Sequence, residues 1–78
     1  MGFYEVIATC AGDYYLDNYF RSYADAVEYI EKFRPYVDGM TDDYFSQIKE
    51  CGLSFSVYSP DGDCVLRKSR TFENLDRS

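Results

Sequence analysis

The chain has 78 residues, which is enough for one domain and no more, so residues 1–78 are expected to fold around a single core. Fourteen acidic residues against eight basic ones give a formal charge of −6, and a field of this sign opposes approach to nucleic-acid phosphates and anionic membranes. Histidine is absent, which excludes the side chain most often used in acid–base catalysis near neutral pH and the commonest metal ligand.

The first part of the chain predicts a β-hairpin. Residues 3–10 form an alternating pattern, residues 11–13 contain a glycine and an aspartate typical of a turn, and residues 14–20 follow as the return strand. Asp17 is expected to face outward from this second strand. The inward side chains of the same strand are expected to be Tyr14, Leu16 and Phe20.

Two helices are predicted in the middle of the chain. Ser22 is a helix cap with an aspartate three residues later, and Pro35 ends the apolar pattern that follows it. Thr41 is the cap of a second helix, and Gly52 is a typical stop. The buried stripe of this second helix is expected to contain Tyr44 or Phe45, Ile48 and Cys51.

A second hairpin completes the pattern. Residues 53–58 alternate between apolar and polar side chains, residues 59–63 read as a proline–glycine turn, and residues 64–70 form the partner strand. The basic residues near its end indicate a solvated edge strand. The order β-β-α-α-β-β predicts an α+β fold, a single small domain in which two hairpins form one antiparallel sheet with both helices on one face. The last residues, 74–78, are expected to fray.

No motif for catalysis, a cofactor or a metal is found. The three cysteines have no C-x-x-C spacing, and we expect three reduced, buried thiols in a cytosolic protein. Neither a glycine-rich phosphate loop nor a G-x-S-x-G sequence occurs. The pairs Asp42–Asp43 and Asp61–Asp63 lack the spacing of a calcium loop. We therefore expect no enzyme activity, no cofactor and no metal site.

Tyrosines interleaved with acidic residues are the most unusual feature, concentrated in residues 14–44. Exposed tyrosine offers a large contact area at low entropic cost and pairs well with arginine, so the pattern is typical of a protein interface. A solvated, solubilising face is the competing interpretation of the same acidic residues. The predicted partner-binding residues are Asp13, Asp17, Glu28, Glu31, Asp38, Asp42 and Asp43, with Tyr15, Tyr29 and Tyr36 as anchors.

In its size, charge, aromatic density and the run from Tyr36 to Tyr44 with three aspartates, the chain resembles the small acidic inhibitors of phages and mobile elements. These include anti-CRISPR and anti-restriction proteins. The resemblance implies inhibition by occupation of a basic nucleic-acid groove, as a DNA mimic. Since such inhibitors share no common fold, it assigns no role to any single residue.

The leading hypothesis is a non-enzymatic inhibitor of a nucleic-acid-handling enzyme, acting in the cytoplasm of the host cell. Its partner would be a protein with a basic nucleic-acid-binding surface, and it would contact neither nucleic acid nor a membrane directly. It would itself be a monomer or a homodimer. The alternative is a structural or self-assembling module that forms a homodimer through exposed tyrosines or an edge strand.

Overall fold

The computed structural model describes residues 2–76 and confirms the predicted α+β fold. The chain follows the predicted order β-β-α-α-β-β. The elements are β1 (Tyr4–Cys10), β2 (Asp13–Phe20), α1 (Tyr23–Lys32), α2 (Asp42–Cys51), β3 (Leu53–Tyr58) and β4 (Cys64–Arg70).

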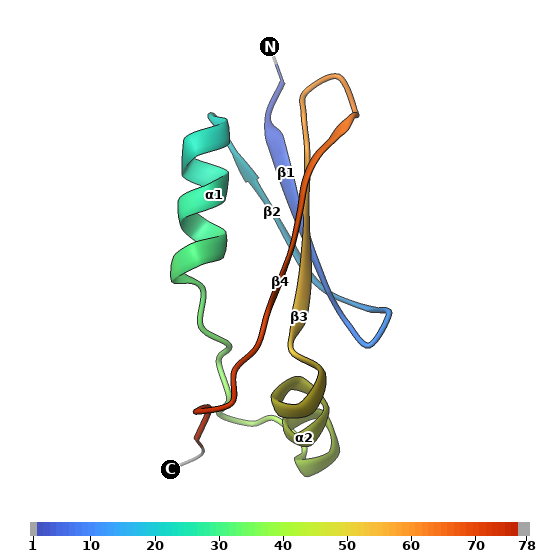
Figure 1. Cartoon of the computed structure of the whole chain (residues 1–78), viewed down its shortest axis with the longest axis vertical. Coiled ribbons are helices and arrows are strands. Elements are labelled where there is room, and N and C mark those ends of the chain that lie inside the picture. The colour runs from blue at the N-terminus through green and yellow to red at the C-terminus, as the bar shows by residue number, and fades with distance from the viewer. Residues whose placement is uncertain (1, 77–78) are drawn as a thin grey trace.

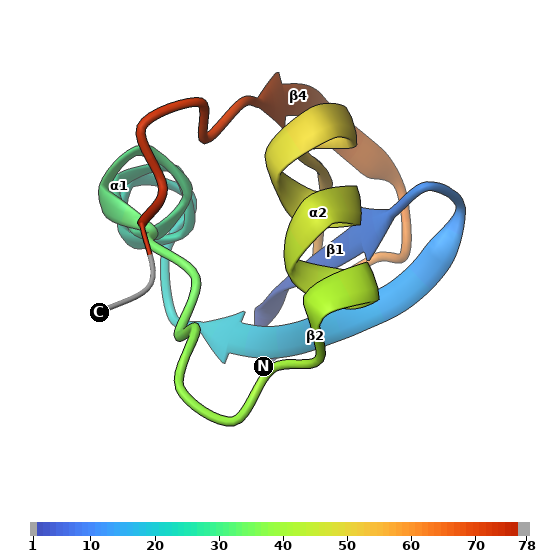
Figure 2. The same cartoon turned by 90° about the horizontal axis from the view of Figure 1, so that it is seen from below.

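The four strands form one antiparallel sheet with the order β2-β1-β3-β4. The two hairpins therefore join through their central strands, where Val6 of β1 lies opposite Val57 of β3. Helix α1 runs alongside the sheet and α2 lies across its lower end (Figure 1). Viewed from below, both helices lie on the same side of the sheet (Figure 2). Within residues 2–76, no helix covers the other face of the sheet.

The core lies between the helices and the inner face of the sheet. Alternate residues of the two central strands are buried because successive side chains point to opposite faces. From the helices, Ala26, Ile30 and Ile48 are buried against them. The buried apolar side chains of the sheet are Val6, Ala8, Cys10, Leu53, Phe55 and Val57.

Both predicted helix starts are confirmed by their capping geometry. The Ser22 hydroxyl accepts a hydrogen bond from the Asp25 amide at 3.1 Å, and the Thr41 hydroxyl accepts one from the Tyr44 amide at 3.2 Å. Each bond satisfies an amide that has no partner within the helix. The second helix ends at Gly52, whose φ of 69° is in the region that favours glycine.

A β-bulge overturns one prediction for the first hairpin. Ala8 lies opposite Leu16 and Thr9 lies opposite Tyr14, so Tyr15 is an extra residue in β2. The bulge brings Tyr15 and Leu16 to the core-facing side and reverses the alternation beyond them. Tyr14, predicted to face inward, is consequently 66% exposed.

Arg70 differs from the predicted solvated end of the edge strand. β4 is an edge strand, but the Arg70 guanidinium is partly buried and donates from one nitrogen to the backbone carbonyls of Ile30 and Phe33. These carbonyls lie at the end of α1, where the helix leaves acceptors without partners and where positive charge is favoured. Arg70 thus ties the last strand to the first helix.

The C-terminal segment extends the core beyond the last strand. Phe72 and Leu75 are each only 5% exposed, and the Leu75 amide donates to the Phe72 carbonyl at 3.0 Å. The fraying predicted for residues 74–78 is therefore wrong at Leu75. Residues 77 and 78 lie outside the described part of the chain.

All three cysteines are free, as predicted, but only Cys10 is buried. Cys51 is the last residue of α2 and Cys64 the first residue of β4, so both lie at the ends of their elements and are exposed. The apolar periodicity of α2 and β4 predicted that both side chains face inward. At the end of an element a side chain can face inward in the pattern and still be exposed to solvent.

Candidate functional site

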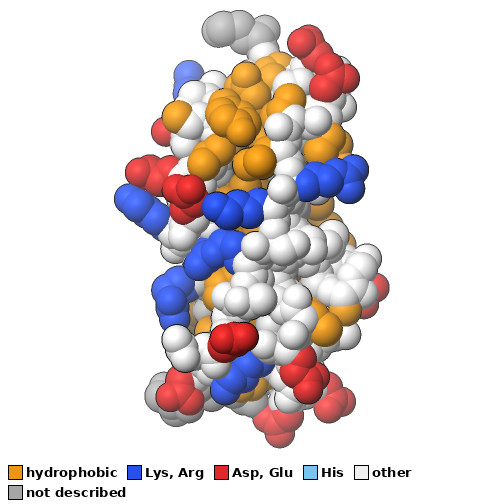
Figure 3. All heavy atoms as spheres, in the orientation of Figure 1, with side chains coloured by type: hydrophobic (Ala, Val, Ile, Leu, Met, Phe, Trp, Pro, Cys, Tyr) orange, Lys and Arg blue, Asp and Glu red, His pale blue; other side chains and the backbone are white. Residues whose placement is uncertain are grey.

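Acidic residues from three segments lie around Tyr44: Asp13 contributes to its raised pKa, Asp38 lines the same hollow, and Asp42 and Asp43 precede it in α2. Asp13 comes from the start of β2, Asp38 from the loop between the helices, and Asp42 and Asp43 from the first turn of α2. We call these four residues the acidic end. Figure 3 shows acidic side chains at this lower end of the molecule, whereas most basic side chains in that view cross its middle.

A shallow hollow of about 390 Å³ opens beside the acidic end. Three tyrosines contribute to its wall, together with the carboxylate of Asp38 and the short connection that leads into α2. The lining residues are Tyr15, Tyr36, Asp38, Gly39, Met40, Thr41 and Tyr44.

Two of the tyrosines are fixed by packing and the third is not. The rings of Tyr15 and Tyr44 lie with their centroids 6.0 Å apart, and Tyr15 also packs edge-on against Phe33 at 6.1 Å. Tyr36 is 75% exposed. The hollow therefore has a rigid aromatic wall and one tyrosine that stands out at its rim.

Burial raises the pKa of both fixed tyrosines. For Tyr15 the main cause is desolvation, followed by the neighbouring Tyr44 and Tyr29; for Tyr44 it is desolvation, followed by Cys10 and Asp13. Because their pKa values lie above the ordinary value of 10, both hydroxyls are neutral at pH 7. Each can donate as well as accept a hydrogen bond in the hollow.

Asp13, Asp38 and Asp43 differ from Glu28 and Glu31 of α1 in their ion pairing. Within residues 2–76, Asp13, Asp38 and Asp43 form no ion pair. On α1, by contrast, Glu28 pairs with Lys32 at 3.2 Å, and Glu31 pairs with Lys68 of the edge strand at 3.7 Å. Within residues 2–76, no ion pair therefore offsets the charges of Asp13, Asp38 and Asp43.

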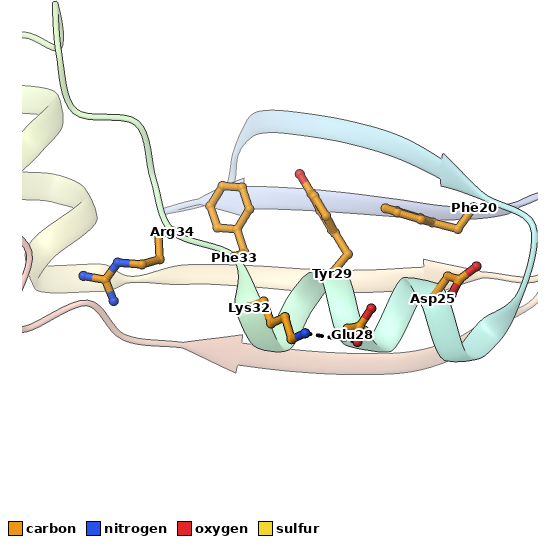
Figure 4. A pocket seen from close by; sticks show the side chains of 7 residues that line it. All are labelled: Phe20, Asp25, Glu28, Tyr29, Lys32, Phe33 and Arg34. Atoms are coloured by element: carbon orange, nitrogen blue, oxygen red, sulfur yellow. Dashed lines mark hydrogen bonds and ion pairs between the residues drawn. The ribbon is translucent and has the colours of Figure 1, made fainter.

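A second hollow, of about 530 Å³, lies between β2 and α1 (Figure 4). The rings of Tyr29 and Phe33 point toward β2, the Phe20 ring comes from the end of β2 and packs against Tyr29, and the Glu28–Lys32 pair lies on the other side of the helix. The Tyr29 hydroxyl accepts a hydrogen bond from the side-chain amide (Nδ2) of Asn18 at 3.2 Å. This predicted anchor therefore already has a partner within the protein. Acidic and basic side chains alternate around this hollow, and no field of a single sign results.

The fold separates the predicted partner-binding residues into three groups. Asp13, Tyr15, Tyr36, Asp38, Asp42 and Asp43 lie at or beside the acidic end. Glu28, Tyr29 and Glu31 lie on α1. Asp17 lies opposite Ile7 on the uncovered face of the sheet.

Tyr44 is an aromatic residue of this site that was not among the predicted partner-binding residues. Tyr44 or Phe45 was expected in the buried stripe of the second helix, and both pack against the core. The Tyr44 ring also lines the hollow, because Tyr44 lies in the first turn of α2, where the helix leaves the core. A signal was present in the sequence, since Tyr44 closes the acidic run that begins at Tyr36.

Residues 2–76 contain no group of three or more histidine, cysteine or carboxylate side chains that could hold a metal ion. In the same part of the chain, no helix is long and apolar enough to cross a membrane. No family model, curated protein or solved structure matches this chain significantly.

Proposed function

We propose that this chain is a non-enzymatic binding protein that inhibits a nucleic-acid-handling enzyme by occupying its basic nucleic-acid-binding surface. The observation that carries the proposal is the juxtaposition of the acidic end with the tyrosine-lined hollow. Carboxylates from separate segments lie around Tyr44 there, and Asp13, Asp38 and Asp43 form no ion pair within residues 2–76.

The chemistry of this surface favours arginine as the group that it binds. Carboxylates accept paired hydrogen bonds from a guanidinium, and the faces of tyrosine rings attract a cation. Asp38 lies in the same hollow as Tyr15, Tyr36 and Tyr44, so one arginine side chain can meet both kinds of group. Arginines that hold phosphates in a nucleic-acid groove present this chemistry on a protein surface.

The acidic residues at the start of α2 also have a structural role. Asp42 and Asp43 lie in the first turn, where a carboxylate stabilises the positive end of the helix by about 0.3–1 kcal/mol. A charge reversal at this position therefore lowers stability as well as any binding. The experiments need a variant whose fold is checked separately.

The test starts from affinity capture with the intact chain as bait, followed by competition. Proteins retained from a host-cell lysate are identified by mass spectrometry and are compared with those retained by an Asp38→Lys/Asp43→Lys bait. A nucleic-acid-binding protein retained only by the unaltered chain is then purified with its labelled nucleic acid. Adding this protein should release the label. A stable ternary complex would exclude groove occupancy.

Asp61→Lys/Asp63→Lys is the matched control. These exposed residues lie in the β3–β4 turn at the opposite end of the molecule, and the double substitution changes the net charge by the same amount (Figure 1). The control bait should retain the same partner as the unaltered chain. Equal loss of the partner with both variants would show that net charge alone, and not the acidic end, determines binding.

A further inference from the structure

The uncovered face of the sheet carries an ordered pattern of side chains. Strand register places them in three rows that cross the sheet. The first row is Tyr14, Thr9, Ser54 and Ser69; the second is Asp17, Ile7, Ser56 and Arg67; the third is Tyr19, Glu5 and Tyr58.

Ile7, at the middle of this face, borders a hollow that extends toward Phe3 and is lined in part by aromatic side chains. Ile7 is only half-buried although it lies on a central strand, and it lines a hollow of about 380 Å³ together with Phe3, Tyr19 and Tyr58. The Tyr19 ring is 60% exposed, and its hydroxyl donates to the Glu5 carboxylate at 3.2 Å. Aromatic and aliphatic side chains of this kind are typical of the centre of a protein interface.

The two edges of the second row carry opposite charges. Asp17 lies on β2 and Arg67 on β4, with two strands between them, so the two groups are about 14 Å apart across the sheet. Neither forms an ion pair within residues 2–76. Another molecule could therefore supply an oppositely charged partner to each of them.

A second copy of the chain supplies both partners at once. Rotation by 180° about an axis parallel to the strands turns the second sheet to face the first and exchanges its edges. β4 of one copy then lies over β2 of the other. Sheets packed face to face lie about 10 Å apart, a gap that an arginine and an aspartate side chain can span together. Two Asp17–Arg67 pairs form around a centre made by Ile7 and the tyrosines.

We propose that this face is the interface of a symmetric homodimer, in which Asp17 of each copy pairs with Arg67 of the other. Symmetric pairing through edge strands is opposed by charge, since antiparallel β2 strands can place Asp13 of one copy opposite Asp17 of the other, and antiparallel β4 strands can place Arg67 opposite Lys68. Interfaces of standard size bury about 800 Å² per partner, so contact limited to one small sheet predicts micromolar affinity.

The same axis has a consequence for the proposed inhibition. A rotation about an axis parallel to the strands leaves every residue at the same position along that axis. The two acidic ends therefore lie side by side at one end of the dimer. A partner with an extended basic groove would then meet two acidic ends, and the second contact would form at high effective concentration. The dimer itself does not depend on the proposed function.

Sedimentation velocity on the intact chain tests the dimer through a charge exchange. Asp17→Arg and Arg67→Asp should each be monomeric, with dimer affinity reduced by roughly 100-fold or more, because each places two like-charged pairs in the interface. An equimolar mixture of the two variants should form a heterodimer, because the charges are then complementary again. The double variant Asp17→Arg/Arg67→Asp should regain the homodimer.

Lys68→Asp is the control, because Lys68 is the neighbouring base on the same strand but lies opposite Phe55, on the helix-covered side. It should leave the dimer unchanged. A chain that stays monomeric up to about 1 mM would overturn the proposal and leave the face open for a different protein. A dimer that persists in both single variants, or a mixture that stays monomeric, would overturn the assigned face. Circular dichroism of each variant separates these outcomes from misfolding.

Discussion

At the residue scale, Gly52 is a position where both conformation and space require glycine. Its φ is 69°, and a Cβ built there would lie 2.2 Å from the backbone oxygen of Arg70. The chain turns at this residue from α2 directly into β3, beside the end of β4. The close approach lets α2 lie against the end of the sheet.

Gly52→Ala should lower the free energy of unfolding by about 2 kcal/mol or more, because backbone strain adds to a clash with a main-chain atom that cannot rotate away. Gly39→Ala is the matched control, since Gly39 has a φ of 79° but nothing within 4 Å of the added carbon. It should cost only about 1 kcal/mol. Urea titration followed by circular dichroism measures both. Equal losses would show that the contact with Arg70 is unimportant.

The cysteines differ in accessibility in a way that a thiol reagent can measure. Cys10 is 1% exposed, and its pKa is raised by burial and then by the nearby Cys51 and Asp13, whereas Cys51 and Cys64 are exposed. The thiolate is the reactive form. In the native protein at pH 8, two thiols should react rapidly with Ellman's reagent and the third only slowly. All three should react in denaturant. Three fast thiols in the native protein would contradict the burial of Cys10.

At the scale of elements, the sequence predicted most of the fold because several signals agreed. In the second hairpin, alternation, a proline–glycine turn and a basic edge strand all indicated the same structure, and the bounds Leu53–Tyr58 and Cys64–Arg70 were correct. The first hairpin lacked this agreement. Tyr14 and Tyr15 are identical residues, so composition could not show which of them the bulge directs into the core.

Long-range contacts account for the other errors. Arg70 lies in a run of basic residues that resembles a solvated strand, and its role becomes visible only when β4 is placed beside the end of α1. Phe72 and Leu75 belong to no regular element and follow no periodicity, yet they pack against the core. Local patterns carry no information about such contacts.

Ionisation of Tyr15 and Tyr44, which pack between β2 and α2, should lower the free energy of unfolding. Their pKa values in the folded protein are raised above 10, so the unfolded chain releases both protons at lower pH than the folded chain. The contribution of these two groups to the free energy of unfolding is present in full below about pH 10. It is lost as the pH rises through the pKa values of the tyrosines in the folded protein. Unfolding free energy should therefore fall more steeply above pH 10 in the parent than in Tyr15→Phe/Tyr44→Phe.

Urea titrations between pH 9 and 11.5 measure the two slopes. Tyr19, whose pKa is also raised, contributes equally in both proteins and cancels in the comparison. Cys10 interacts with both Tyr15 and Tyr44, so its contribution belongs to the difference between the two slopes. At pH 7 the two proteins should have similar stability, because neither hydroxyl is ionised there. Identical slopes above pH 10 would show that the hollow does not desolvate these tyrosines.

At the scale of the whole molecule, the sequence predicted a charged binding surface but not its place. Asp13 is 25 residues from Asp38 in the chain, and the fold brings both near Tyr44, since Asp13 contributes to its raised pKa and Asp38 lines the same hollow. The fold places Asp17 on the uncovered sheet face and leaves Glu28 and Glu31 in ion pairs. Net charge and composition are the same for all these arrangements, so only the topology distinguishes them.

Arg70 is also unsuitable for charge reversal in binding tests, because its reversal would disturb α1.

The long-range field of the acidic end should control how fast the protein meets its partner. Binding to a basic groove is electrostatically steered, so the association rate should fall about tenfold or more between roughly 50 and 500 mM salt, while the dissociation rate changes little. Asp38→Asn/Asp43→Asn should reduce this salt dependence.

The molecule is 41 Å long, several times the screening length of about 10 Å at 0.1 M salt. Asp61→Asn/Asp63→Asn, at the opposite end, should therefore leave the dependence nearly unchanged. Stopped-flow or surface plasmon resonance with the captured partner measures all three proteins. If the two double variants lower the salt dependence equally, steering comes from net charge and the acidic end has no special role.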